Sequence, residues 1–136
     1  MARFDRSGPR GPNRRMPIKV YEYKNCSTCQ KALKYLEAKK IPFERRPIVD
    51  QPPTLAELKR MLELLKRDGG SARNLLNTSG QQYRELGMAE KLKAGMSEAE
   101  ILKLLAGNGK LIKRPFMLTE TSGAVGFKRD VWDKLV

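Results

Sequence analysis

The chain has 136 residues, which is enough for one domain with its own hydrophobic core. Its composition is 40% hydrophobic and 32% charged, which excludes an intrinsically disordered protein. No apolar run approaches the roughly 20 residues needed to cross a membrane. The net charge is +13, and residues 1–15 supply +4 of it because five arginines there stand against one aspartate.

The first 16 residues have a composition unlike the rest of the chain. They combine arginine with glycine and proline and have no apolar periodicity, so we expect a flexible basic arm at 1–16 and a folded domain at 17–136. Such an arm can contact nucleic acid or be a solvated extension. We favour the extension, and we expect no direct nucleic-acid binding. The start also has no apolar core of a secretory signal, which favours a cytoplasmic protein with reduced thiols.

The first half of the domain predicts a strand–helix–strand unit. Residues 18–23 alternate around β-formers, and Ser27 or Thr28 can cap a helix that places Ala32, Leu33 and Leu36 on one face. The helix stops at Ile41-Pro42, and residues 42–48 read as a second strand. The unit is about 30 residues long, the length of a βαβ crossover.

Helices and then two short strands follow. Thr54–Glu57 is a capping box before a leucine stripe that ends at Gly69-Gly70, and Ser97–Glu100 is a second capping box. Between them lie a short helix at 71–76 and a loop at 77–82. We expect strands at 115–118 and 124–127 and a final helix carrying Val131, Trp132 and Leu135. The order β-α-β, helices, β-β-α predicts an α/β layered domain with a helical insertion.

Cys26 and Cys29 are the only cysteines, and the chain has no histidine. Zinc needs four ligands, usually Cys and His, so a zinc site is disfavoured. A structural disulfide would close too short a loop to constrain the unfolded chain much. At the start of a helix, free N–H groups and the helix dipole stabilise a thiolate at Cys26, and Cys29 lies one turn on. A redox pair is therefore the favoured interpretation.

Two arginines elsewhere can complete such a site. Arg114 precedes Pro115 at the start of a strand, where the peptide bond can be cis, and this turn would present Arg114 to the cysteine loop. Arg73 could point back toward an anion held over Cys26. Taken alone, each arginine is better explained as a solvated surface charge.

Four segments together resemble the arsenate reductase ArsC/Spx family. They read "VYEYKNCSTCQKALKYLEAKKIPFE", "PPTLAELKRMLE", "ARNLLNTSGQQYRELG" and "LIKRPFML…VGFKRDVW", and the likeness runs from about Ile18 to Leu135. The resemblance implies a thioredoxin-like core with a helical insertion. It implies that Cys26 is the nucleophile, and that Arg73 and Arg114, the latter before a cis-proline at Pro115, contact the oxyanion. We add the loop residues Asn25, Ser27 and Thr28 to the expected substrate-binding set.

Two departures from the family pattern bear on the substrate. Glutathione-using arsenate reductases usually have no cysteine at the position of Cys29. Their third oxyanion arginine aligns with Phe127, while Lys128 and Arg129 are out of register. We therefore predict a thiol–disulfide oxidoreductase in which Cys29 resolves, with arsenate as one possible substrate.

The predicted reaction needs no bound cofactor and no metal. Its substrate would be a small oxyanion or a disulfide, and glutathione or thioredoxin would be the thiol reductant. The alternative is an Spx-type regulator that binds the RNA polymerase α-subunit and uses Cys26 and Cys29 as a redox switch. The segment from Ser71 to Leu86 resembles the reductases more than the regulators, which favours the enzyme.

Overall fold

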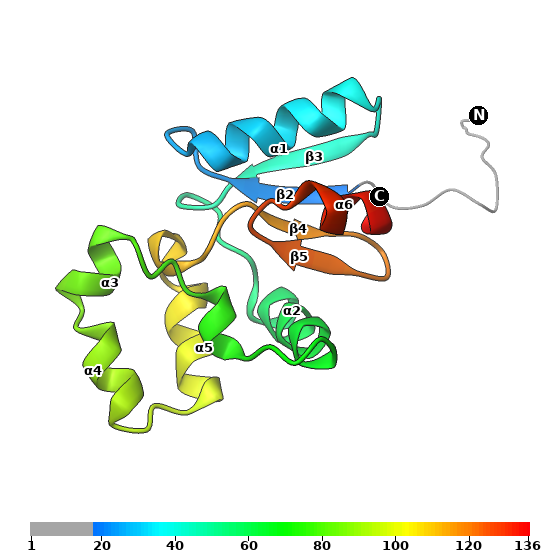
Figure 1. The fold of residues 1–136 in the computed structure, drawn as a ribbon. Helices are drawn as coiled ribbons and strands as arrows, with labels where there is room; N and C mark the ends of the chain where they lie inside the picture. The colour runs from blue at the N-terminus through cyan, green and yellow to red at the C-terminus, as the bar shows by residue number, and fades with distance from the viewer. Residues whose placement is uncertain (1–17) are drawn as a thin grey trace.

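The computed structural model describes residues 18–136, and the predicted arm lies outside this range. Its centre is a four-stranded sheet of order β3-β2-β4-β5 (Figure 1). β2 is parallel to β3 and antiparallel to β4, which is antiparallel to β5. The strands are β2 (Ile18–Glu22), β3 (Phe43–Pro47), β4 (Phe116–Leu118) and β5 (Gly123–Val125).

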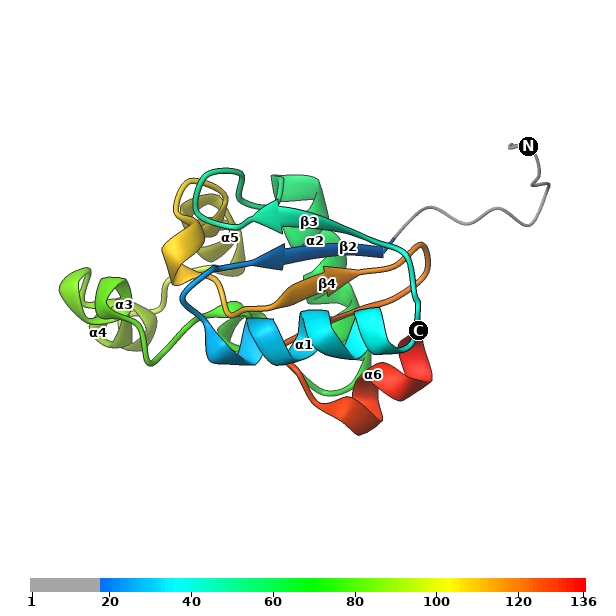
Figure 2. The same ribbon diagram turned by 90° about the horizontal axis from the view of Figure 1, so that it is seen from above.

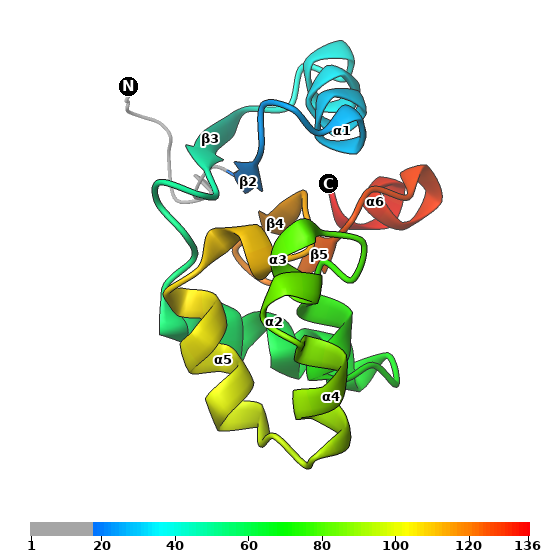
Figure 3. The ribbon, with the colours of Figure 1, turned by 90° about the vertical axis from the view of Figure 1, so that its left-hand side faces the viewer.

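Helices cover both faces of this sheet. α1 and α6 lie side by side on one face, and α2 and α5 lie on the other, with α3 and α4 beyond them (Figures 2 and 3). Two 3₁₀ turns, η1 and η2, join the insertion to the sheet. The bounds are α1 (Ser27–Ala38), α2 (Leu55–Arg67), η1 (Ala72–Leu75), α3 (Gln81–Glu85), α4 (Met88–Lys93), α5 (Glu98–Ala106), η2 (Gly109–Leu111) and α6 (Arg129–Leu135).

Strand alternation divides the core into two layers. Val20 and Met117 face α1 and α6, where Trp132 is also buried, whereas Tyr21 and Phe116 face the insertion. Successive strand residues point to opposite faces, so each strand contributes to both layers. The larger layer lies on the insertion side and continues between α2, α5 and the 3₁₀ turns.

The structure confirms the α/β core and the order of its elements. Both capping boxes are present, at Thr54–Glu57 and at Ser97–Glu100, and each begins a helix. The prediction of Ser27 or Thr28 as the cap of α1 was wrong, because Cys26 is the N-cap residue. Residues 77–82 are not wholly loop, since α3 begins at Gln81. The short helix at 71–76 is the 3₁₀ turn η1.

A close backbone approach fixes η2 against the sheet. Gly109 is buried, and a Cβ atom built on it would lie 1.8 Å from the carbonyl oxygen of Ile48. Only glycine fits there without a backbone shift. The contact holds the segment that leads to β4 beside the end of β3, and so it positions the residues before Phe116.

Glu57 connects the sheet to the start of α2. Its carboxylate accepts hydrogen bonds from Tyr21 Oη at 2.6 Å and Lys19 Nζ at 2.8 Å, both on β2. It also accepts one from the backbone N–H of Thr54 at 3.0 Å. Burial alone would raise the pKa of Glu57, but the hydrogen bonds from Lys19 and Tyr21 hold it below its ordinary value.

Among residues 18–136, no helix is both long and apolar enough to span a bilayer.

Candidate functional site

Cys26 lies where the chain turns from β2 into α1. Its backbone N–H donates to the carbonyl of Tyr23 at 3.0 Å, which closes the loop. As the N-cap residue, Cys26 directs its Sγ back to accept the N–H of Cys29 at 3.3 Å. The sulfur therefore takes the place that a Ser or Asp oxygen usually has at a helix start. The N–H of Cys29 and the positive end of the helix dipole therefore both face this sulfur.

The two cysteines differ in accessibility and in proton affinity. Cys26 is half-buried, whereas Cys29 has an exposed fraction of 0%. Burial, aided by the hydrogen bond with Cys26, raises the pKa of Cys29 to about 12. Cys29 is consequently a protonated thiol at neutral pH, and Cys26 is the sulfur that an incoming molecule can reach.

Arg114 brings a positive charge to this pair. The Arg114–Pro115 peptide bond is cis, as the sequence suggested. The guanidinium carbon lies 4.5 Å from the centre of the Tyr23 ring, a cation–π contact. Its charge opposes the rise in the pKa of Cys29, so its field reaches the cysteines. Its Nη1 is buried and has no hydrogen-bond partner among the described residues.

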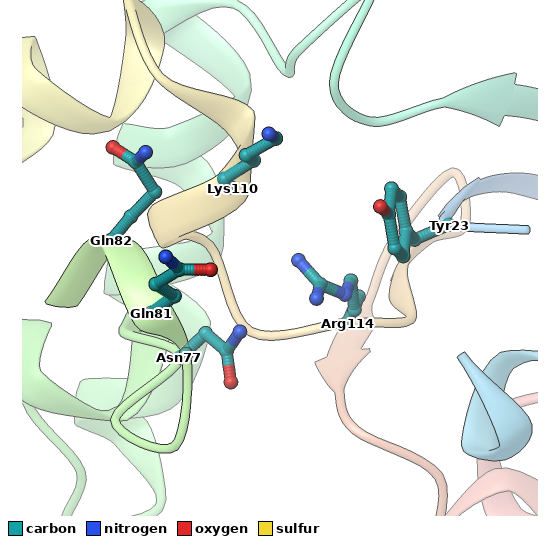
Figure 4. Close-up of a pocket in the computed structure, with 7 residues that line it drawn as sticks. Tyr23, Asn77, Gln81, Gln82, Lys110 and Arg114 are labelled. Carbon is teal, nitrogen blue, oxygen red and sulfur yellow. The ribbon is translucent and has the colours of Figure 1, made fainter. Parts of the chain in front are cut away.

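A pocket of about 200 Å³ opens next to Arg114 (Figure 4). Arg114 points into it with Tyr23 beside it, while Lys110 and three side-chain amides stand across from them. The pocket thus offers two cations and several amide groups to an anionic ligand. Its lining residues are Tyr23, Asn77, Gly80, Gln81, Gln82, Lys110 and Arg114.

Sequence reasoning found Arg114 but missed the amides and Lys110. The reason is a long-range connection: Leu76 pairs with Ile112, and the Lys113 N–H donates to the Leu75 carbonyl at 2.7 Å. These bonds hold the residue after Leu76, namely Asn77, beside the segment that carries Arg114. The only local signal was the run of polar side chains in "NTSGQQ".

Arg73 lies on η1 with an exposed side chain, and it does not line the pocket. Its backbone N–H donates to the Ser71 hydroxyl at 3.3 Å. A role for Arg73 in anion binding therefore stays a prediction.

The expected loop residues Asn25, Ser27 and Thr28 are exposed around Cys26. Their position leaves them open to a substrate that reaches this sulfur. A substrate contact for these three residues also stays a prediction.

Phe127, which the sequence comparison above aligned with the third family arginine, belongs to an aromatic cluster. Its ring centre lies 5.0 Å from that of Trp132 and 5.3 Å from that of Tyr35. Phe127 therefore packs in the core layer shared with α1 and α6, and it does not line the pocket beside Arg114. Among the described residues no group of three or more acidic, Cys or His side chains could hold a metal ion.

Comparison with known proteins places the chain in a family. The model of the ArsC family matches residues 21–135, nearly all of the described range. The chain belongs to the ArsC family. This membership accounts for the thioredoxin-like core with its helical insertion.

The relatives of this chain include an uncharacterized protein, an arsenate reductase and a transcriptional regulator. The chain is 42% identical to the uncharacterized protein YusI of Bacillus subtilis (strain 168), over 88% of this chain and 98% of that protein. It is 31% identical to an arsenate reductase of Neisseria meningitidis (80% and 89% covered) and 30% identical to the global transcriptional regulator Spx of Enterococcus faecalis (83% and 81% covered). An ArsC family related protein from Bacteroides fragilis superposes with a TM-score of 0.81 at 45% identity, covering 89% and 98%.

Proposed function

We propose that this ArsC family protein is a thiol–disulfide oxidoreductase in which Cys26 is the nucleophile and Cys29 the resolving cysteine. One observation carries the proposal: Cys26 is the accessible N-cap of α1, and the buried Cys29, one turn away, donates its backbone N–H to the Cys26 sulfur. Arg114 supports it by adding positive charge beside the pair.

The reaction consists of two exchanges. The Cys26 thiolate attacks one sulfur of a substrate disulfide, so that a Cys26–substrate disulfide forms and the other substrate sulfur leaves as a thiolate. Cys29 then gives up its proton and attacks the Cys26 sulfur, which releases the second substrate thiolate and forms the Cys26–Cys29 disulfide. The substrate gains two electrons and the cysteine pair loses two. Glutathione or thioredoxin would return the pair to its dithiol form.

The pocket beside Arg114 supports an anionic substrate. A mixed disulfide of glutathione carries carboxylates that Arg114 and Lys110 can bind, and its amide groups match the primary amides of the lining. An oxyanion such as arsenate is the other candidate, with one family cation replaced by Phe127. Each lost charge-assisted contact costs about 1.5–3 kcal/mol, which favours the disulfide.

Turnover tests the proposal directly. We expect the wild-type protein to reduce a glutathione mixed disulfide or arsenate with glutathione or thioredoxin as the donor. Cys26→Ser should be inactive, and Cys29→Ser should stop after one exchange. Full activity of Cys26→Ser would contradict the proposal.

A second function rests on the similarity to Spx. A regulator of that type would bind the RNA polymerase α-subunit through a surface controlled by the oxidation of Cys26 and Cys29. Retention of purified α-subunit by the immobilised protein, depending on its redox state and without turnover of any substrate above, would favour this alternative.

A further inference from the structure

Positive charge is unevenly distributed over the described residues. They carry a net charge of +9, because residues 1–15 hold +4 of the total of +13. Residues 24–40 and 128–134, the segments of α1 and α6 with their flanking turns, contain eight cations and three carboxylates. Five of the nine net charges therefore belong to these two segments, whose helices lie on the same face of the sheet (Figures 1 and 3).

These charges are exposed and mostly unpaired within the described range. Lys31 and Lys34 are three residues apart on the outer side of α1. From α6, the guanidinium of Arg129 lies 5.9 Å from the ring centre of Tyr35 on α1, so this cation lies against that helix. Among the cations of these two segments only Lys39 has an ion-pair partner in residues 18–136. We call Lys24, Lys31, Lys34, Lys128 and Arg129 the basic face.

Two cations of the basic face, Lys24 and Lys31, lie close in sequence to Cys26, the sulfur that must be reduced after each turnover. Cys29 has an exposed fraction of 0%, so a reductant can attack only Cys26. Lys24 precedes Cys26 by two residues, and Lys31 follows Cys26 by five residues, an axial rise of roughly 7.5 Å at 1.5 Å per residue. That distance is within the Debye length of about 8–10 Å at physiological salt, so these charges act on a molecule approaching Cys26.

We propose that the basic face docks an acidic protein dithiol of the thioredoxin type, which reduces the Cys26–Cys29 disulfide. The inference rests on the proposed function. The partner's thiolate attacks the Cys26 sulfur and forms an intermolecular disulfide, and Cys29 leaves as a thiolate and takes up a proton. The partner's second thiol then displaces Cys26 and leaves the partner oxidised. Two electrons pass from the partner to the cysteine pair. Charge complementarity favours an acidic surface on the partner and accelerates its association.

Reversing the charges of Lys31 and Lys34 tests whether the basic face binds the partner. The oxidised protein is mixed with an acidic bacterial thioredoxin, its reductase and NADPH, and the reduction rate is measured at low ionic strength and at ~0.5 M salt. Lys31→Glu/Lys34→Glu should lower the rate at least about 10-fold at low salt and little at high salt. Lys91→Glu/Lys93→Glu, an equal charge change on α4, should keep the wild-type rate. Dithiothreitol, a small neutral reductant, should reduce all three proteins equally fast.

Several outcomes overturn the inference. They are an equal loss in the α4 control, a loss that salt does not remove, or a parallel loss with dithiothreitol. Suppression of the thioredoxin rate by equimolar duplex DNA would assign the basic face to nucleic acid instead. If the first variant fails to show a wild-type melting transition, Lys31→Gln/Lys34→Gln replaces it, and an unchanged rate again overturns the inference. A wild-type protein that forms no Cys26–Cys29 disulfide contradicts the proposed function as well. A thioredoxin reduction rate that does not depend on the charges of the basic face contradicts this inference alone.

Discussion

Replacing Arg114 by Gln should weaken the reaction with anionic disulfides and leave neutral ones nearly unaffected. Arg114 contributes one of the two cations of the pocket, and its buried Nη1 has no partner in the described residues until a ligand arrives. A hydrogen bond between charged groups contributes about 1.5–3 kcal/mol, which corresponds to roughly 10- to 150-fold in rate constant when one such contact is lost. We therefore expect a fall of this size in the second-order rate constant for a carboxylate-bearing disulfide.

The assay compares two aromatic disulfides. 5,5′-Dithiobis(2-nitrobenzoate) carries two carboxylates and 2,2′-dithiodipyridine carries none, and both release a coloured product when Cys26 attacks. The ratio of the two rate constants should fall in Arg114→Gln and stay constant in Lys113→Gln, which removes the neighbouring exposed charge. Equal losses for both disulfides in Arg114→Gln would refute a charge-binding role, as would the same ratio in the control.

Two further predictions concern the scaffold. Gly109→Ala should destabilise the fold by about 1–3 kcal/mol in urea unfolding, because its Cβ would lie 1.8 Å from the Ile48 carbonyl oxygen, while Gly107→Ala, with 3.8 Å to the nearest atom, should change little. Glu57→Gln should cost about 1 kcal/mol near pH 7 through the weakened bond from Tyr21. Because the folded pKa of Glu57 lies below its ordinary value of 4.5, its stabilisation is present above pH 4.5 and is lost as the pH falls through the folded pKa. The difference from wild type should therefore shrink in acid; a difference that stays constant between pH 7 and the acid range would contradict this assignment.

Sequence patterns predicted those helices and strands that are determined by neighbouring residues in the chain. The capping boxes at Thr54 and Ser97 satisfy helix-start amides with side chains three residues away, so they can be recognised in sequence. α3 and α4 have five and six residues, too few to establish a helical period, and Gly87, with φ of 62°, separates them. Neither was predicted as a distinct helix.

The residues of the candidate site also fall into two groups: those predicted from their neighbours in sequence and those placed by long-range contacts. Cys26 and Cys29 follow a strand and begin a helix, and Arg114 precedes a proline, so each can be proposed from its neighbours in sequence. Asn77 and Lys110 enter the pocket because hydrogen bonds join η1 to the segment before β4 across more than 30 residues. No sequence period encodes that contact. We did not predict that Cys26 caps α1, because Cys is rarely the residue expected at an N-cap.

Trapping the first exchange tests the central claim most directly. Cys29→Ser is mixed with a glutathione disulfide, and the adduct is located by peptide mapping and mass spectrometry, with Cys26→Ser as the matched control. The account predicts one glutathione on the peptide containing Cys26 and almost none on Cys29 of the control, because Cys29 is buried and its pKa is raised to about 12. An adduct on Cys29 of the control that forms as fast as the one on Cys26 would contradict it.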